Sequence, residues 1–161
     1  MIVHAGLVAL RLGGRWRGAL IEGPSGAGKS DLALRALDSG FRLAADDRVE
    51  LWTSAGRLFG RAPDALRGLV EVRGQGVDLA AALPFCEVSL VVTGEPGERI
   101  PEPESVLRLG VRLPLARIQL LEASAPAKMR RALEWLGQGR EGAYQTRFAV
   151  SVSPRPGGDS R

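Results

Sequence analysis

Eight residues near the N-terminus read Gly23-Pro24-Ser25-Gly26-Ala27-Gly28-Lys29-Ser30. They match the pattern G-x-x-x-x-G-K-[ST], whose backbone amides and following helix N-terminus bind phosphate groups. The pattern is informative only between a strand and a helix. An apolar stretch, residues 16–21, precedes it, and residues 32–37 place four apolar side chains on one helical face. The sequence therefore predicts a nucleotide-binding loop, and we call residues 23–30 the phosphate loop.

Two side chains of the phosphate loop have chemical roles in this motif. Lys29 reaches the β- and γ-phosphates, and the hydroxyl of Ser30 binds Mg²⁺. The alternative is a glycine-rich turn that merely leads into a helix. Because Lys29 is one of only two lysines in the chain and stands where the motif requires it, the nucleotide site is favoured.

Apolar periodicity and turn residues predict an α/β fold with a mixed sheet and flanking helices. A glycine pair, Gly13-Gly14, predicts a tight hairpin between the first two strands. The proline-rich segment 94–103 predicts an exposed loop. The expected strands cover residues 3–12, 16–21, 41–45, 49–52, 58–59, 69–72, 87–93 and 118–121, and the expected helices cover residues 30–37 and 125–136.

Length and composition indicate one globular domain. The chain has 161 residues, of which 45% are hydrophobic and 25% charged. We expect residues 1–138 to form the phosphate-loop domain and residues 139–161 a partly disordered extension. A single cysteine, Cys86, excludes a disulfide framework. Because the N-terminus has no signal-peptide pattern and no apolar run reaches a membrane span, we expect a cytoplasmic protein without a membrane partner.

The charge balance raises the question of nucleic-acid binding. The net charge is +4, and the sequence pI is about 10.2. The positive charges are nearly all arginines, spread from Arg11 to Arg161 without a run and without interleaved aromatic residues. This distribution is typical of a composition bias, so we expect no nucleic-acid partner.

Acidic residues follow one predicted strand and lie on another. Asp46 and Asp47 end the strand that follows the first helix, and Glu71 precedes Arg73-Gly74-Gln75-Gly76. One carboxylate can hold Mg²⁺ while another takes a proton from a hydroxyl nucleophile. A solvated surface turn is the alternative for the aspartate pair. The chain has no asparagine, which excludes the guanine-reading N-K-x-D motif of GTPases and favours a small phosphotransferase.

Taken together, these motifs resemble those of the catalytic C-terminal domain of HPr kinase/phosphorylase, in the short form without the N-terminal domain. The resemblance rests on His4, on the phosphate loop followed by Asp31, on Leu43-Ala44-Ala45-Asp46-Asp47 and on Glu71-Val72-Arg73-Gly74-Gln75-Gly76. It implies a fold like that of phosphoenolpyruvate carboxykinase and assembly as a homohexamer. It also implies an ATP- and Mg²⁺-dependent serine kinase that phosphorylates the phosphocarrier HPr, with a possible reverse phosphorylase activity.

The resemblance assigns roles to individual residues. It implies that Asp46 is the catalytic base and that His4 and Lys29 act beside the transferred phosphoryl group, with His4 helping to set the ionisation of Asp46. Ser30, Asp47 and Glu71 would form the Mg²⁺ site.

The resemblance does not extend to the second half of the chain. Longer family members carry a Pro-Gly-Arg-Asn loop near the C-terminus, and the corresponding residues 121–128 contain neither arginine nor asparagine. Lys128 either supplies the cation there or is an ordinary helix residue. Two other functions stay open: a kinase of a small hydroxylated metabolite, and a non-catalytic ATP-binding regulator whose helix at residues 125–136 binds a partner.

Overall fold

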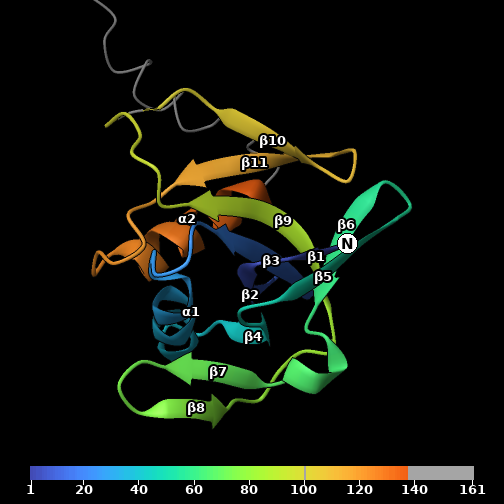
Figure 1. The fold of residues 1–161 in the computed structure, drawn as a ribbon. Coiled ribbons are helices and arrows are strands. Elements are labelled where there is room, and N and C mark those ends of the chain that lie inside the picture. The colour runs from blue at the N-terminus through green and yellow to red at the C-terminus, as the bar shows by residue number, and fades with distance from the viewer. Residues whose placement is uncertain (100, 138–161) are drawn as a thin grey trace, which may run out of the picture.

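A mixed nine-stranded sheet with two helices on one face forms the body of the protein (Figure 1). The structure, a computed structural model, describes residues 1–99 and 101–137; the expected extension at 139–161 lies outside them. The strands of the large sheet are β1 (Ile2–Val3), β2 (Ala5–Leu12), β3 (Arg15–Glu22), β4 (Arg42–Ala45), β5 (Val49–Ser54), β6 (Arg57–Arg61), β9 (Cys86–Thr93), β10 (Glu104–Arg108) and β11 (Val111–Arg117). The helices are α1 (Lys29–Asp38) and α2 (Ala125–Gly137), with a short 3₁₀ turn at Asp64–Leu66.

The central strands run β11, β9, β3, β2 and β4 in order across the sheet. Strand β9 pairs in parallel with both β3 and β11. Strand β2 is antiparallel to both β3 and β4, so β4 runs in the same direction as β3. The carboxyl ends of four strands therefore meet at one edge of the sheet, where ligands of α/β proteins bind.

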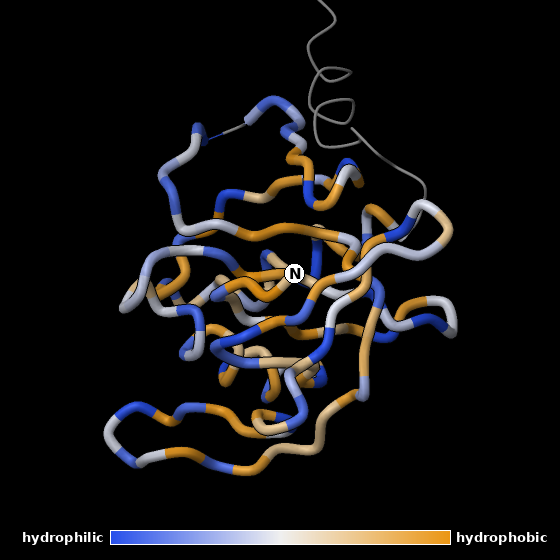
Figure 2. The backbone as a smooth tube through the Cα atoms, turned by 45° about the vertical axis from the view of Figure 1, so that its right-hand side comes forward, coloured by the Kyte–Doolittle hydropathy of each residue, from blue (hydrophilic) through white to orange (hydrophobic). Residues whose placement is uncertain are grey.

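The sheet separates two apolar clusters, and Figure 2 shows the apolar residues along its central strands. Alternate residues of β2 point to opposite faces. Val8 packs with Leu32 of α1 and Met129 of α2 in one cluster. Leu7 packs in the other with Leu58 of β6. The segment between β3 and β4 thus folds as a helix because its apolar face is buried against the sheet.

A second, two-stranded sheet lies beside α1. It pairs β7 (Leu69–Val72) with β8 (Gly76–Leu79). Val70 of β7 is buried in the same cluster as Leu32, which fixes β7 against the helix. This contact brings Glu71, the next residue along β7, near the start of α1, where its amide donates to Asp46.

Most of the expected elements are confirmed, including the tight turn at Gly13-Gly14, where both residues have positive φ. The strand expected at residues 118–121 is wrong: β11 ends at Arg117. One strand was expected within residues 111–121, and it occupies their first seven residues, across Pro114. Pro114 lies opposite Ser105 of β10, and the pairing with β9 begins one residue later, at Leu115, so the β9 side of the strand needs no N–H group from the proline. Strand β10, with charged residues at both ends, was not expected.

Strand β10 is tied to the strand that leads into the phosphate loop. Arg108 donates from Nε to Oε1 of Glu22 over 2.8 Å, and its second nitrogen reaches the other carboxylate oxygen. This hydrogen bonding raises the pKa of Arg108. Among the residues described, no helix is long and apolar enough to cross a bilayer.

Candidate active site

The phosphate loop joins β3 to α1, as the sequence predicts. Gly28, which precedes the helix, has φ = +100°, a conformation that side chains other than hydrogen strongly disfavour. A Cβ atom at Gly28 would stand 2.6 Å from Cδ2 of Leu121, far inside van der Waals contact. Glycine is therefore required here both by the backbone angle and by the close approach of Leu121.

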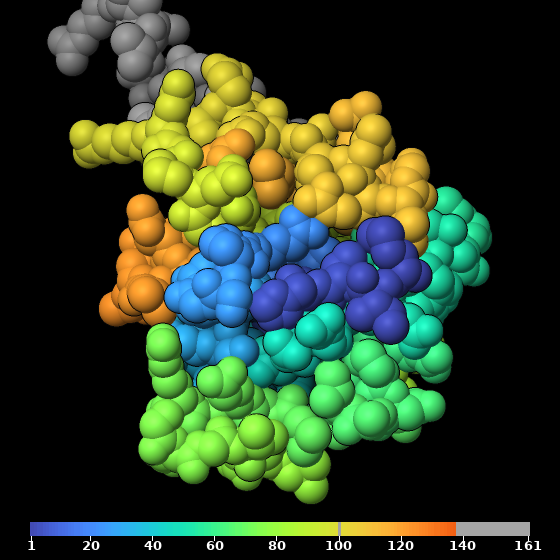
Figure 3. All heavy atoms as spheres, in the orientation of Figure 1, coloured from blue at the N-terminus to red at the C-terminus, as the bar shows by residue number. Residues whose placement is uncertain are grey.

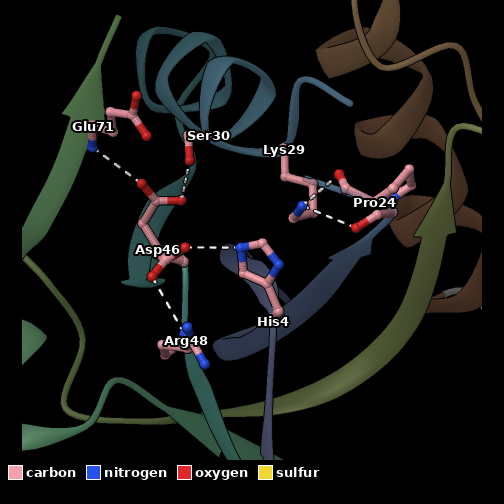
Figure 4. Close-up of polar contacts among 9 residues, drawn as sticks. His4, Pro24, Lys29, Ser30, Asp46, Arg48 and Glu71 are labelled. Carbon is pink, nitrogen blue, oxygen red and sulfur yellow. Dashed lines mark hydrogen bonds and ion pairs between the residues drawn. The ribbon is translucent and has the colours of Figure 1, made fainter. Parts of the chain in front are cut away.

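Lys29 lies inside the loop and not in solvent. Its side chain is buried, and Nζ donates hydrogen bonds of 2.9 Å to the carbonyl oxygens of Gly23 and Pro24 (Figure 4). The ammonium group thus connects the end of the loop to its beginning. The positive charge that would bind a phosphate group is therefore held at the loop in the absence of a ligand.

Asp46 connects three elements at the carboxyl edge of the sheet. It is only 4% exposed. The hydroxyl of Ser30, in the first turn of α1, donates to Oδ1 over 2.8 Å, and the backbone amide of Glu71 donates to Oδ2 over 3.1 Å. Since β4 and β3 end at the same edge, Asp46 and the phosphate loop are brought together by strand order alone.

Asp47 points to a different partner. Its Oδ1 lies 2.8 Å from Nε2 of His4, and its Oδ2 lies 3.4 Å from Nε of Arg48. Asp47 has φ = +66°, which turns its side chain away from the direction taken by Asp46. The resemblance gives His4 a role beside the transferred phosphoryl group and in the ionisation of Asp46; in the structure its side-chain partner is Asp47. Both side chains of this pair are accessible to solvent, at 41% for His4 and 56% for Asp47.

Glu71 reaches the site through its backbone as well as its side chain. Its amide faces Asp46, and in Figure 4 its carboxylate lies on the same side of Asp46 as Ser30. Ser30, Asp46 and Glu71 therefore share one region at the start of α1. Within residues 1–99 and 101–137, no group of three or more acidic, histidine or cysteine side chains forms a preassembled metal site.

Arg35 is a functional candidate that the sequence argument missed. From the exposed side of α1 it donates to the carbonyl oxygen of Glu122 over 2.9 Å and to that of Leu120. It also pairs with Asp31 one turn earlier, at 2.7 Å. The i, i+4 spacing of Asp31 and Arg35 indicates an ordinary surface ion pair. Contacts with carbonyl groups more than eighty residues away leave no sequence pattern.

Lys128, which the sequence left as either an active-site cation or a helix residue, lies in the first turn of α2. Its Nζ is 2.5 Å from Oε1 of Glu122. The pair joins α2 to the segment that Arg35 holds. In this structure Lys128 thus has a local carboxylate partner.

One solved structure has the same fold. It is the structure of the Hpr(Ser) kinase/phosphatase from Coxiella burnetii, which matches 84% of this chain and 98% of its own with a TM-score of 0.69. The two sequences are 23% identical, so the likeness concerns the fold. The expected α/β class with a mixed sheet is confirmed.

Curated relatives match the first half of the chain. The HPr kinase/phosphorylase of Limosilactobacillus reuteri is 42% identical over 83 residues, which cover 47% of this chain and 26% of the relative. That of Brevibacillus brevis is 49% identical over 61 residues, covering 37% and 20% respectively. The matched region is thus about a quarter or less of the length of these relatives.

The family model of the HPr Serine kinase C-terminal domain matches residues 3–83, about half of the chain. This range includes His4, the phosphate loop, both aspartates and Glu71. The matched segment therefore contains the hydrogen bonds of Asp46 with Ser30 and Glu71 and the contact between His4 and Asp47. On this match, the chain belongs to the HPr Serine kinase C-terminal domain family.

Proposed function

We propose that this protein is a serine kinase that transfers the γ-phosphoryl group of ATP to HPr, with Mg²⁺ as the metal. The observation that carries the proposal is the contact between Ser30 of the phosphate loop and Asp46, within a chain of this family. It supports a carboxylate beside the terminal phosphate of a bound nucleotide. Phosphoryl transfer needs this combination of charge neutralisation and positioning.

The phosphate loop is the proposed binding site for the triphosphate. All eight residues from Gly23 to Ser30 form this site, including Pro24, Ser25, Gly26, Ala27 and Gly28; all except Pro24, which has no N–H group, can offer backbone amides at or before the N-terminus of α1. Lys29 supplies a positive charge that is buried before the nucleotide arrives. A buried charge needs polar partners, and phosphate oxygens would replace the loop carbonyls that now serve.

The oxygen atoms at the start of α1 suit Mg²⁺. The Ser30 hydroxyl donates a hydrogen bond to Asp46. Both lone pairs of the Ser30 oxygen are therefore free to bind a metal. Proteins hold Mg²⁺ through one or two carboxylates together with substrate phosphates, so no preassembled cage is needed. We assign Ser30, Asp47 and Glu71 to the ion, which would neutralise charge on the phosphates; Asp47 would exchange its contact with His4 for the metal.

Asp46 is the proposed general base for the acceptor hydroxyl. It lies at the edge of the phosphate loop and stays fixed by the Glu71 amide. Its Oδ1 accepts from the Ser30 hydroxyl and keeps a second lone pair that can accept the acceptor hydroxyl. The pair of His4 and Asp47 then stands on the solvent side, where a protein acceptor must approach.

HPr is the proposed acceptor because the names of the curated relatives identify HPr kinases. A homohexamer, a reverse phosphorylase activity and a cytoplasmic location are further proposals that rest on the same family resemblance. The departure of residues 121–128 from the Pro-Gly-Arg-Asn pattern makes phosphorylase activity the weakest of these.

The test is incubation of the protein with γ-labelled ATP, Mg²⁺ and HPr, followed by mass spectrometry of HPr. We expect one phosphoserine on HPr, and none when Lys29→Met replaces the wild type. Unlabelled HPr together with ATP consumption by a small hydroxylated compound would support a metabolite kinase instead. Tight ATP binding without turnover would support the regulator.

A further inference from the structure

We propose that the nucleoside of the bound triphosphate lies in a cleft of about 300 Å³ on the opposite side of the phosphate loop from Asp46. The inference rests on the proposed function, because it concerns the same nucleotide. Three segments line the cleft: the outer face of the phosphate loop at Gly23, Pro24 and Ala27, residues 93–95 after β9, and residues 119–121 after β11. Figure 3 shows these segments, in light blue, yellow-green and orange, meeting on one face of the molecule.

Strand topology explains why the cleft forms there. Glu22 at the end of β3 and Arg117 at the end of β11 both pair with Thr93 at the end of β9. Three parallel strands therefore end at the same level, and the chain leaves each of them at the carboxyl edge. Ligands bind in crevices of this kind in open α/β sheets.

The cleft and the acids lie on opposite sides of the loop. In the order β11, β9, β3, β2 and β4, the cleft is over the first three strands and Asp46 follows the last. Three strand spacings of about 4.8 Å separate β9 from β4, or about 14 Å. A nucleotide whose phosphates fill the loop and whose terminal phosphate faces Asp46 would extend its ribose and base toward β9 and β11.

The walls of the cleft suit a ribose and a planar base. Pro24, Leu120 and Leu121 offer apolar surface, and Leu121 is 68% exposed while it packs against Gly28. Polar groups are few, as in most small-molecule sites. The Thr93 hydroxyl accepts from the Glu95 amide over 3.4 Å, so its own proton can be donated, and Gln119 offers an amide on the exposed rim.

The wall formed by residues 119–121 is fixed to the phosphate-binding helix. Arg35 of α1 donates to the carbonyl groups of Leu120 and Glu122, on both sides of Leu121. A preorganised wall binds a base without an ordering cost. Arg35 is thus a positioning residue, which acts on the nucleoside through Leu121.

The test compares the binding of ATP and of inorganic triphosphate, each with Mg²⁺, by calorimetry. We expect the wild type to bind ATP about tenfold or more tightly than inorganic triphosphate, because the base buries apolar surface. Leu121→Ala should remove most of this preference and leave triphosphate affinity within about twofold. The matched control is Leu107→Ala, an exposed leucine on β10 outside the cleft, which should leave both affinities unchanged.

The outcomes separate the two proposals. If the wild type binds ATP no more tightly than triphosphate, or if Leu121→Ala leaves the preference intact, the nucleoside site is wrong and the phosphate site stands. If Leu121→Ala weakens both ligands equally, Leu121 supports the phosphate loop only, and the nucleoside site is again wrong. If the wild type binds neither ligand, the proposed function fails and this inference fails with it.

Discussion

The hydroxyl of Ser30 donates a hydrogen bond to Oδ1 of Asp46, 2.8 Å away, across the start of α1. Ser30 lies in the first turn of α1 and Asp46 directly follows β4, so the hydrogen bond joins these two elements directly. Asp46 is nearly fully buried, so the bond forms in a region of low dielectric, where it is strong and costly to lose. The proposed chemistry depends on this contact.

Replacing the buried carboxylate should abolish phosphoryl transfer. In Asp46→Asn the side chain keeps its shape but loses the capacity to accept a proton. One of its two accepting oxygens becomes a donating NH₂ group, so it can no longer accept from both Ser30 and the Glu71 amide. We expect kcat to fall by about 10²- to 10⁴-fold, the usual contribution of a general base, while ATP affinity changes little. Steady-state kinetics with HPr and calorimetry with ATP measure the two quantities.

Asp47→Asn provides the comparison, because the two aspartates are neighbours with different partners. We expect Asp47→Asn to raise the Mg²⁺ concentration needed for half-maximal activity, while a measurable kcat remains at saturating metal. A complete loss of turnover in Asp47→Asn, with residual activity in Asp46→Asn, would exchange the two roles.

Lys29→Met should weaken the binding of inorganic triphosphate by about tenfold or more, because a hydrogen bond to a charged group contributes about 1.5–3 kcal/mol. The substitution also removes the two bonds that join the helix start to Gly23 and Pro24. Arg131→Met on α2 changes the net charge equally and serves as the control, since Arg131 is exposed. Equal binding by Lys29→Met and by the control would contradict the assignment of Lys29 to the phosphates.

Gly28→Ala should destabilise the protein more than Gly56→Ala does. Both glycines have positive φ, which costs a side chain of L configuration about 1–2 kcal/mol. A Cβ atom at Gly56 meets open space, whereas one at Gly28 meets Leu121. Urea unfolding measures the difference, and the double variant Gly28→Ala/Leu121→Ala should recover part of it. Equal free energies of unfolding for the two alanine variants would show that Leu121 does not crowd Gly28.

Cys86 should resist alkylation at pH 8 in the folded protein. Burial raises the pKa of its thiol from 9.0 to about 12, because the thiolate would lose its solvation, with a smaller contribution from Glu87. The raised pKa stabilises the fold below the pKa of the unfolded thiol, and this contribution is lost as the pH rises toward 12. Mass spectrometry after iodoacetamide treatment should show modification only in denaturant. Rapid modification without denaturant would indicate an accessible thiolate.

The sequence predicted the parts of the site that depend on local patterns. The phosphate loop, α1 and the aspartates at the end of β4 follow from turn residues and apolar periodicity over short stretches. The pairing of His4 with Asp47 depends on the positive φ of Asp47, which no pattern specifies for an aspartate. Strand β10 escaped prediction because its stability comes from pairing with β11, and the contacts of Arg35 because they join distant segments.

Arg35 holds main-chain carbonyl groups, and every amino acid supplies one at those positions. The side chain of Leu121, between the two anchored carbonyl groups, can therefore be exchanged while the main chain on both sides of it stays in place.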